Sequence, residues 1–216
     1  MFLLCSNARL GSEAPDMHPH PRRHYTLPRR WQPLTDAEWD ALLPFVLVQN
    51  GPGRPLKDAR RRMDAIFWVA AADCPWRDLP TRFGKPDTAS RHFRRLANAG
   101  LWERLLRALA RADAPPALRA LENWACAACR RATRLRGMRI ITLARRLGFL
   151  SALKGPPRML PDADLSERVH RWIVPIVKDA AERGLRAVPR GFFREARRWL
   201  TLCAGRARVP RFLQPA

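Results

Sequence analysis

Apolar residues recur at helical spacing along most of the chain. The first apolar face is formed by Trp39, Leu42, Leu43 and Val46. Their spacing of i, i+3, i+4 and i+7 predicts a helix that buries one side. Thr35, with Glu38 three residues later, predicts a capping box at its start, and the segment 50–53 (Asn-Gly-Pro-Gly) should end it.

The same spacing predicts further helices over about 58–73, 88–99 and 101–110. Asp87 or Thr88 is the expected cap of the third helix, and Gly100 is its expected stop. Phe93, Leu96 and Ala97 should face inward, with Arg91, His92, Arg94 and Arg95 largely outward. Beyond residue 115, helices are expected over about 118–137, 165–177 and 192–200, whereas 140–153 fits either a helix or a short initial strand. The fold class is therefore all-α.

Three segments differ in composition. Residues 1–33 lack periodicity and are rich in Pro and Arg, so we expect a disordered basic tail. The histidines at 18, 20 and 24 are expected to be solvated rather than to bind metal. Residues 34–110 form the predicted helical domain, and residues 111–216 form an Arg-rich helical extension of unknown role.

The chain is strongly basic. Lys and Arg number 41 against 19 acidic residues, which gives a net charge of +22, and only four of the basic residues are lysine. Neutralising phosphates releases counterions, so a polyanion is the expected partner, although GC-rich coding also enriches arginine. Most of the excess lies outside the helical domain, since residues 34–110 carry +4, residues 111–216 carry +15 and residues 1–33 carry +3.

Cysteine and hydropathy patterns bear on compartment and metals. Five scattered cysteines, no leader peptide and no apolar run of about 18 residues predict a reduced, cytoplasmic protein without a membrane span. Cys126 and Cys129 have the spacing of half a zinc site, but on an Ala-rich helix core packing is the favoured interpretation. The Arg-rich stretch 130–146 either follows a phosphate backbone or carries charge that was never selected.

Several sequence blocks occur in a specific order over about 75 residues. They are Leu-Thr-Asp-Ala-Glu-Trp at 34–39, Gly-Arg-Pro at 53–55, Arg-Arg-Arg-Met-Asp-Ala-Ile-Phe-Trp-Val at 60–69, Cys-Pro-Trp-Arg-Asp-Leu-Pro at 74–80, Arg-Phe-Gly at 82–84, Phe-Arg-Arg-Leu at 93–96 and Gly-Leu-Trp-Glu-Arg-Leu-Leu at 100–106. Residues 34–110 thereby resemble the N-terminal domain of insertion-sequence-five-type (insertion-element-402-like) transposases. The resemblance implies a helical DNA-binding domain.

The pattern within this segment is compatible with a helix-turn-helix pair formed by residues 77–83 and the following Arg-rich helix. The side chains expected to reach DNA bases are Thr88, Ser90, Arg91, Arg94 and Arg95, and those expected to contact the backbone are Arg60, Arg61 and Arg62. Alternatively, these arginines form a solvated face paired with Asp58, Asp64 and Asp87. Trp39, Trp68, Trp76 and Trp102 are expected in the core.

The family's catalytic domain is ribonuclease-H-like, with three carboxylates that hold Mg²⁺. The acids after residue 110 lie at polar helix positions or in Pro-rich loops, and no Val/Ile-rich strand carries them. We therefore expect no catalytic residues and no cofactor, with Mg²⁺ entering only through a separate catalytic half.

Three functions remain open at this stage. The first is a transposase-derived DNA-binding protein that recognises the inverted-repeat ends of an insertion element, acting alone or as a homodimer. The second is an active transposase, or the first half of a frameshifted one whose catalytic half is encoded in another frame. The third is a helical interaction protein that binds RNA nonspecifically.

Overall fold

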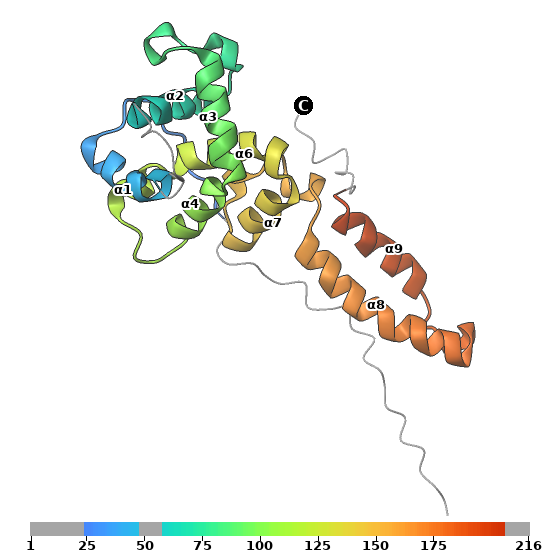
Figure 1. Cartoon of the computed structure of the whole chain (residues 1–216). Coiled ribbons are helices and arrows are strands. Elements are labelled where there is room, and N and C mark those ends of the chain that lie inside the picture. Colours follow the sequence, from blue (N-terminus) through green and yellow to red (C-terminus); the bar gives the residue numbers. More distant parts are fainter. Residues whose placement is uncertain (1–23, 48–57, 206–216) are drawn as a thin grey trace, which may run out of the picture. The chain divides into compact units, whose positions relative to one another are not determined.

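The structure, a computed structural model, describes residues 24–47 and 58–205, and these are folded almost entirely into helices (Figure 1). The predicted all-α class is confirmed. The chain divides into two compact units, one of residues 20–157 and one that contains residues 158–205. The first unit extends well beyond the predicted boundary at residue 110.

Helix α1 (Asp36–Leu47) opens the first unit and begins with the predicted capping box. The Glu38 amide donates to Thr35 Oγ1 at 3.2 Å, and the Thr35 amide donates to Glu38 Oε2 at 2.9 Å. Leu42 and Val46 are buried, as the spacing predicts. The expected stop at 50–53 lies outside the described residues.

Helix α2 (Ala59–Ala71) was expected over about 58–73 and buries Met63, Ile66, Phe67 and Ala70, which share one face at helical spacing. The chain then makes two 3-10 turns, η1 (Trp76–Asp78) and η2 (Thr81–Phe83), where the sequence predicts one short helix. Proline has no amide hydrogen and restricts the preceding residue, so Leu79 before Pro80 is extended and divides the segment. The helix predicted over 77–83, and with it the expected helix-turn-helix pair, is not formed.

Helix α3 (Pro86–Asn98) starts earlier than predicted. Pro86 occupies its first position, where the fixed φ of proline suits a helix, and Lys85 before it is extended. Asp87 therefore lies within the first turn and caps nothing. Gly100 adopts φ +74, the left-handed conformation that turns the chain into α4 (Leu101–Leu109).

Three more helices complete the first unit: α5 (Pro116–Ala120), α6 (Glu122–Arg136) and α7 (Met138–Leu147), followed by η3 (Leu150–Ala152). The segment 140–147 is helical, which resolves the ambiguity in the sequence. Helix α6 is the centre of the unit, because α2, α3, α4, α7 and η3 all pack on it (Figure 1). Its Trp124 is fully buried against Phe67 of α2, with ring centroids 5.7 Å apart.

Residues 24–33 pack on this core, so the predicted disordered tail is wrong for that part; residues 1–23 lie outside the described residues. His24 Nε2 lies 2.6 Å from Glu122 Oε1, and Arg29 pairs with the buried Glu38 at 2.6 Å. The Arg29 guanidinium also stacks 4.0 Å from the Trp124 ring. These contacts join the segment to α1 and α6.

The second unit is a helical hairpin of α8 (Ala163–Arg183) and α9 (Phe192–Cys203), joined through η5 (Leu185–Ala187). A further 3-10 turn, η4 (Pro157–Met159), spans the division between the units. The Asp162 side chain accepts the Leu165 amide at 3.0 Å and caps α8, the helix-start role that its sequence position suggests. Trp172 of α8 packs against Phe192 of α9.

Candidate nucleic-acid interface

The outer face of α3 carries four of the residues predicted to reach DNA. Thr88, Arg91, Arg94 and Arg95 are all exposed and together line a shallow hollow of about 560 Å³. The inner face of the same helix buries Ala89, Phe93, Leu96 and Ala97. Packing against α2, α4 and α6 fixes this inner face, so the arginines project from a rigid support.

The three arginines of this face differ in their partners. Arg91 pairs with Asp87 one turn earlier, an exposed i,i+4 pair of the kind that contributes only a few tenths of a kcal/mol. Arg94 and Arg95 form no hydrogen bond or ion pair with any residue of the described chain. Their guanidinium groups are therefore available to an external anion without the loss of an internal contact.

Two predictions for the outer face of α3 are wrong. Ser90 was expected to reach DNA bases and His92 to face largely outward, but both side chains are buried. Ser90 is 8% exposed and His92 is 4% exposed, so neither side chain reaches a surface where DNA would lie. Burial, together with the nearby charges of Arg62 and Arg95, lowers the pKa of His92 from 6.5 to about 4. His92 is consequently a neutral core residue near neutral pH.

The three arginines at the start of α2 do not behave alike. Arg60 donates to the Leu34 carbonyl and pairs with Asp36 at 2.6 Å, and Arg61 donates to the Arg82 carbonyl. These two side chains hold neighbouring segments of the fold in place. Arg62, half-buried beside His92, has no such contact in the described residues, so it remains the best candidate of the three for a backbone phosphate.

The Arg-rich stretch 130–146 is largely structural. Arg130 donates to the Ser151 carbonyl, Arg131 to the Cys74 carbonyl and Arg145 to the Pro157 carbonyl, while Arg136 pairs with Glu103 at 2.8 Å. The Arg131 guanidinium also lies 5.4 Å from the centre of the Trp76 ring. Sequence reasoning missed these roles because the acceptors are mostly backbone carbonyls from distant parts of the chain.

Of the four tryptophans expected in the core, Trp102 is buried, whereas Trp39, Trp68 and Trp76 are partly buried. Trp102 is fully buried, with its ring 5.6 Å from that of Phe93, and Trp76 packs on the other side of Phe93. Cys126 and Cys129 are fully buried on α6, where burial raises the pKa of Cys126 to about 12 and that of Cys129 well above its usual value. Core packing of this pair is confirmed.

Four of the eight acids after residue 110 have the following partners within the fold. Asp113 is held by Arg111 at 2.7 Å, Glu122 by His24, and Asp179 by Arg183 at 3.0 Å, while Asp162 caps α8. Within residues 24–47 and 58–205, no group of three His, Cys, Asp or Glu side chains is arranged to hold a metal ion. The described chain thus offers an arginine surface for binding and no assembled metal centre.

Comparison with known proteins places this surface within a recognised segment. Residues 34–106 match a family model described as "Putative transposase of IS4/5 family (DUF4096)". The uncharacterized protein y4sN of Sinorhizobium fredii is 33% identical over 79 residues, which are 36% of this chain and 63% of that relative. No solved structure matches the chain. Among the helices that the structure describes, none has the length and apolar character needed to cross a membrane.

Proposed function

Residues 34–106 match the model of a putative IS4/5-family transposase, and on this premise we propose that the first unit binds DNA through the outer face of α3. The proposed target is an inverted-repeat end of an insertion element, bound by one copy or by a homodimer. Thr88, Arg91, Arg94 and Arg95 are assigned to the DNA surface, and Arg62 to the flanking phosphate backbone. The proposed DNA surface does not include Ser90, because its side chain is buried. It does not include Arg60 or Arg61 either, because their side chains bind other segments of the fold.

The observation that carries the proposal is the pair of unengaged guanidiniums on α3. Arginine is suited to this role because its planar fork donates two parallel hydrogen bonds to a phosphate or to a guanine edge. Arg94 and Arg95 are adjacent in sequence, so they point in directions about 100° apart around the helix. One can therefore face bases while the other faces the backbone.

A single-substitution series tests this assignment. The full chain would be titrated against labelled inverted-repeat duplex, with and without unlabelled competitor, for the wild type, Arg94→Ala and Arg95→Ala. Arg134→Ala is the matched control, because Arg134 is exposed on α6 and forms no hydrogen bond or ion pair within the described chain. It removes the same charge from a different face.

We expect the α3 variants to weaken binding by about tenfold to a hundredfold where a base contact is lost, which corresponds to about 1–3 kcal/mol. Loss of a phosphate contact should instead weaken all sequences alike and reduce the salt dependence by about one contact. Affinities equal to that of Arg134→Ala would overturn the assignment to α3. Equal binding of wild type to RNA and to any duplex would favour a nonspecific polyanion-binding protein.

Strand cleavage is the second function to separate from binding. The partners of Asp113, Glu122, Asp162 and Asp179 occupy these carboxylates within the fold, which supports a chain that binds DNA without cutting it. A nicking assay with Mg²⁺ on the same duplex tests this point. Nicking by the purified chain would overturn the non-catalytic assignment, and nicking only after addition of a second polypeptide would identify a separate catalytic half.

A further inference from the structure

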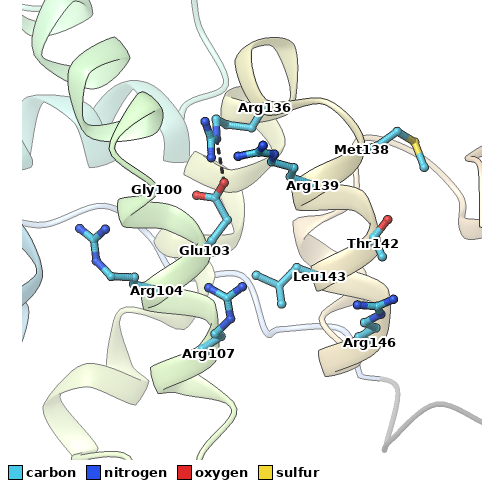
Figure 2. Close-up of a pocket in the computed structure, with 10 residues that line it drawn as sticks. All are labelled: Gly100, Glu103, Arg104, Arg107, Arg136, Met138, Arg139, Thr142, Leu143 and Arg146. Atoms are coloured by element: carbon cyan, nitrogen blue, oxygen red, sulfur yellow. Dashed lines mark hydrogen bonds and ion pairs between the residues drawn. The ribbon is translucent and has the colours of Figure 1, made fainter. Parts of the chain in front are cut away.

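A second basic surface lies between α4 and α7. Arg136, Arg139 and Arg146 of this surface belong to the Arg-rich stretch 130–146, for which a phosphate-backbone contact was one of the two interpretations, but the sequence did not link that stretch to α4. Figure 2 shows a pocket of about 570 Å³ whose charged lining consists of Glu103, Arg104, Arg107, Arg136, Arg139 and Arg146. Five arginines against one glutamate give the lining a formal charge of +4. That is as much positive charge as the whole segment 34–110 carries.

The helical register of both walls creates this concentration of charge. On α4, Gly100, Glu103, Arg104 and Arg107 follow the spacing i, i+3, i+4 and i+7. On α7, Arg139, Thr142, Leu143 and Arg146 follow the same spacing. This spacing brings residues from both helices to the lining, although Figure 2 shows the Arg104 side chain directed away from α7.

Part of the lining is committed to the fold. Arg136 Nε donates to Glu103 Oε1 at 2.8 Å, and Arg104 Nη1 donates to the Ala99 carbonyl at 2.6 Å. The Glu103 side chain is only 8% exposed, so the single negative charge is neutralised and withdrawn from solvent. The first contact joins the end of α6 to α4, and the second holds Arg104 against the turn that precedes α4.

Unlike Arg104 and Arg136, the side chains of Arg107 and Arg139 are not engaged by the fold. Both are exposed, one from each wall, and neither forms a hydrogen bond or ion pair with the described residues. Figure 2 shows the Arg107 side chain on the α7 side of its helix and the Arg139 side chain extending toward Arg136 and Glu103. Two cations held by fixed helices across one hollow repel each other unless an anion lies between them.

The uncharged residues of the lining indicate which kind of anion the pocket suits. None of the ten lining residues is aromatic, so the pocket has no surface on which a nucleobase would stack. Its apolar side chains, Met138 and Leu143, offer little to a hydrophobic ligand. Arg139 and Arg146 are separated by seven residue steps, or about 10 Å of helix, over which one strand of B-DNA passes about three phosphates.

We infer that the α4–α7 pocket binds phosphate groups of a nucleic-acid backbone, with Arg107 and Arg139 as the principal ligands. The identification of that nucleic acid as DNA rests on the proposed function, whereas the phosphate chemistry does not. The pocket would then be a second contact region, separate from the outer face of α3. Phosphate contacts of this kind position a protein on a duplex without reading its sequence.

The test compares Arg107→Gln/Arg139→Gln with the control Arg30→Gln/Arg134→Gln in the full-length chain. The control removes the same charge from exposed arginines of the same unit that lie outside the pocket. Binding of a labelled duplex would be measured by fluorescence anisotropy from 50 to 300 mM salt. Thermal melts monitored by circular dichroism should coincide for all three proteins, since neither pair of side chains supports the core.

We expect the pocket variant to lose affinity on the order of tenfold for each contact at 0.1 M salt, with the slope of log K against log salt reduced by about 1.8 relative to the wild type. The control should lose much less. Equal losses in the two variants would overturn the inference, because they would reflect net charge alone. A variant that binds duplex like the control but no longer binds inorganic phosphate would place a free phosphate compound in the pocket and overturn the backbone assignment.

The same series separates this inference from the proposed function. If Arg94→Ala and Arg95→Ala leave DNA affinity unchanged while the pocket variant weakens it, the assignment to α3 fails and the pocket assignment stands. If the pocket variant leaves DNA affinity unchanged while Arg94→Ala and Arg95→Ala weaken it, the pocket assignment fails and the assignment to α3 stands. For two independent contact regions, we expect both sets of variants to weaken DNA binding. Their effects on the slope of log K against log salt should be additive when the substitutions are combined.

Discussion

The buried imidazole of His92 makes the stability of the first unit dependent on pH. In the folded chain the pKa of His92 is lowered to about 4, whereas an unfolded histidine titrates near 6.5. Between about pH 4 and pH 6.5, His92 is protonated in the unfolded chain but not in the folded chain. Protonation therefore favours unfolding, so the full stability is present above about pH 6.5 and is lost progressively as the pH falls toward 4.

The size of this effect follows from the two pKa values. Each pKa unit corresponds to about 1.4 kcal/mol, so the interval from 6.5 to about 4 amounts to about 3 kcal/mol. Domains of this kind are stabilised by about 5–15 kcal/mol in total. A single imidazole thus controls a substantial part of the free energy of unfolding.

Urea unfolding of the wild type and of His92→Gln, followed by circular dichroism at several values between pH 4 and 7.5, measures the effect. All other ionisable groups are common to the two proteins, so the difference in the free energy of unfolding isolates His92. We expect that difference to change by about 3 kcal/mol in favour of the variant as the pH falls. A difference that stays constant over this range would refute the reasoning.

The arginines beside His92 provide an internal control. Arg95 is one of the two charges that lower the pKa of His92, whereas its neighbour Arg94 is not. Arg95→Gln should therefore reduce the pH dependence of stability, and Arg94→Gln should leave it unchanged. Equal behaviour of the two variants would show that Arg95 does not contribute to the lowered pKa of His92.

Three further predictions concern the first unit. Thr35→Ala should lower the free energy of unfolding by about 1 kcal/mol, and Thr35→Ser should restore most of it, because Oγ1 caps α1; equal urea midpoints for wild type and Thr35→Ala would contradict this role. Cys126 and Cys129 should resist a thiol reagent at pH 8 in the native chain and react in urea, and rapid native reaction would contradict their burial. A fragment of residues 20–110 should lack the cooperative urea transition of residues 20–157, and equal transitions would show that α6 is dispensable.

The sequence predicted well those elements whose determinants are local. The capping box of Thr35 and Glu38 needs only a spacing of three, and the buried faces of α1 and α2 need only a helical period. The prediction of one short helix over residues 77–83 was wrong, because Pro80 and the extended Leu79 before it divide the segment into two 3-10 turns. The early start of α3 at Pro86 was missed for a similar reason.

The candidate site was predicted in part. The period of α3 placed Arg91, Arg94 and Arg95 outside, and they are exposed. Ser90 and His92 lie at the margins of the buried stripe, and helical spacing alone does not reveal that neighbouring helices cover these margins too. The pocket between α4 and α7 could not be foreseen, because its two walls are separated by about thirty residues and only tertiary packing brings them together.

The central helix α6 lies outside the segment that this chain shares with other proteins. The segment shared with other proteins ends at residue 106, yet the helix on which its own helices pack begins at residue 122. Without α6, the inner faces of α2, α3 and α4 would meet water at Phe67 and Trp102. Any other polypeptide that folds the shared segment in this way must therefore cover those faces with a helix of its own, and that helix need only match them in shape and apolar character.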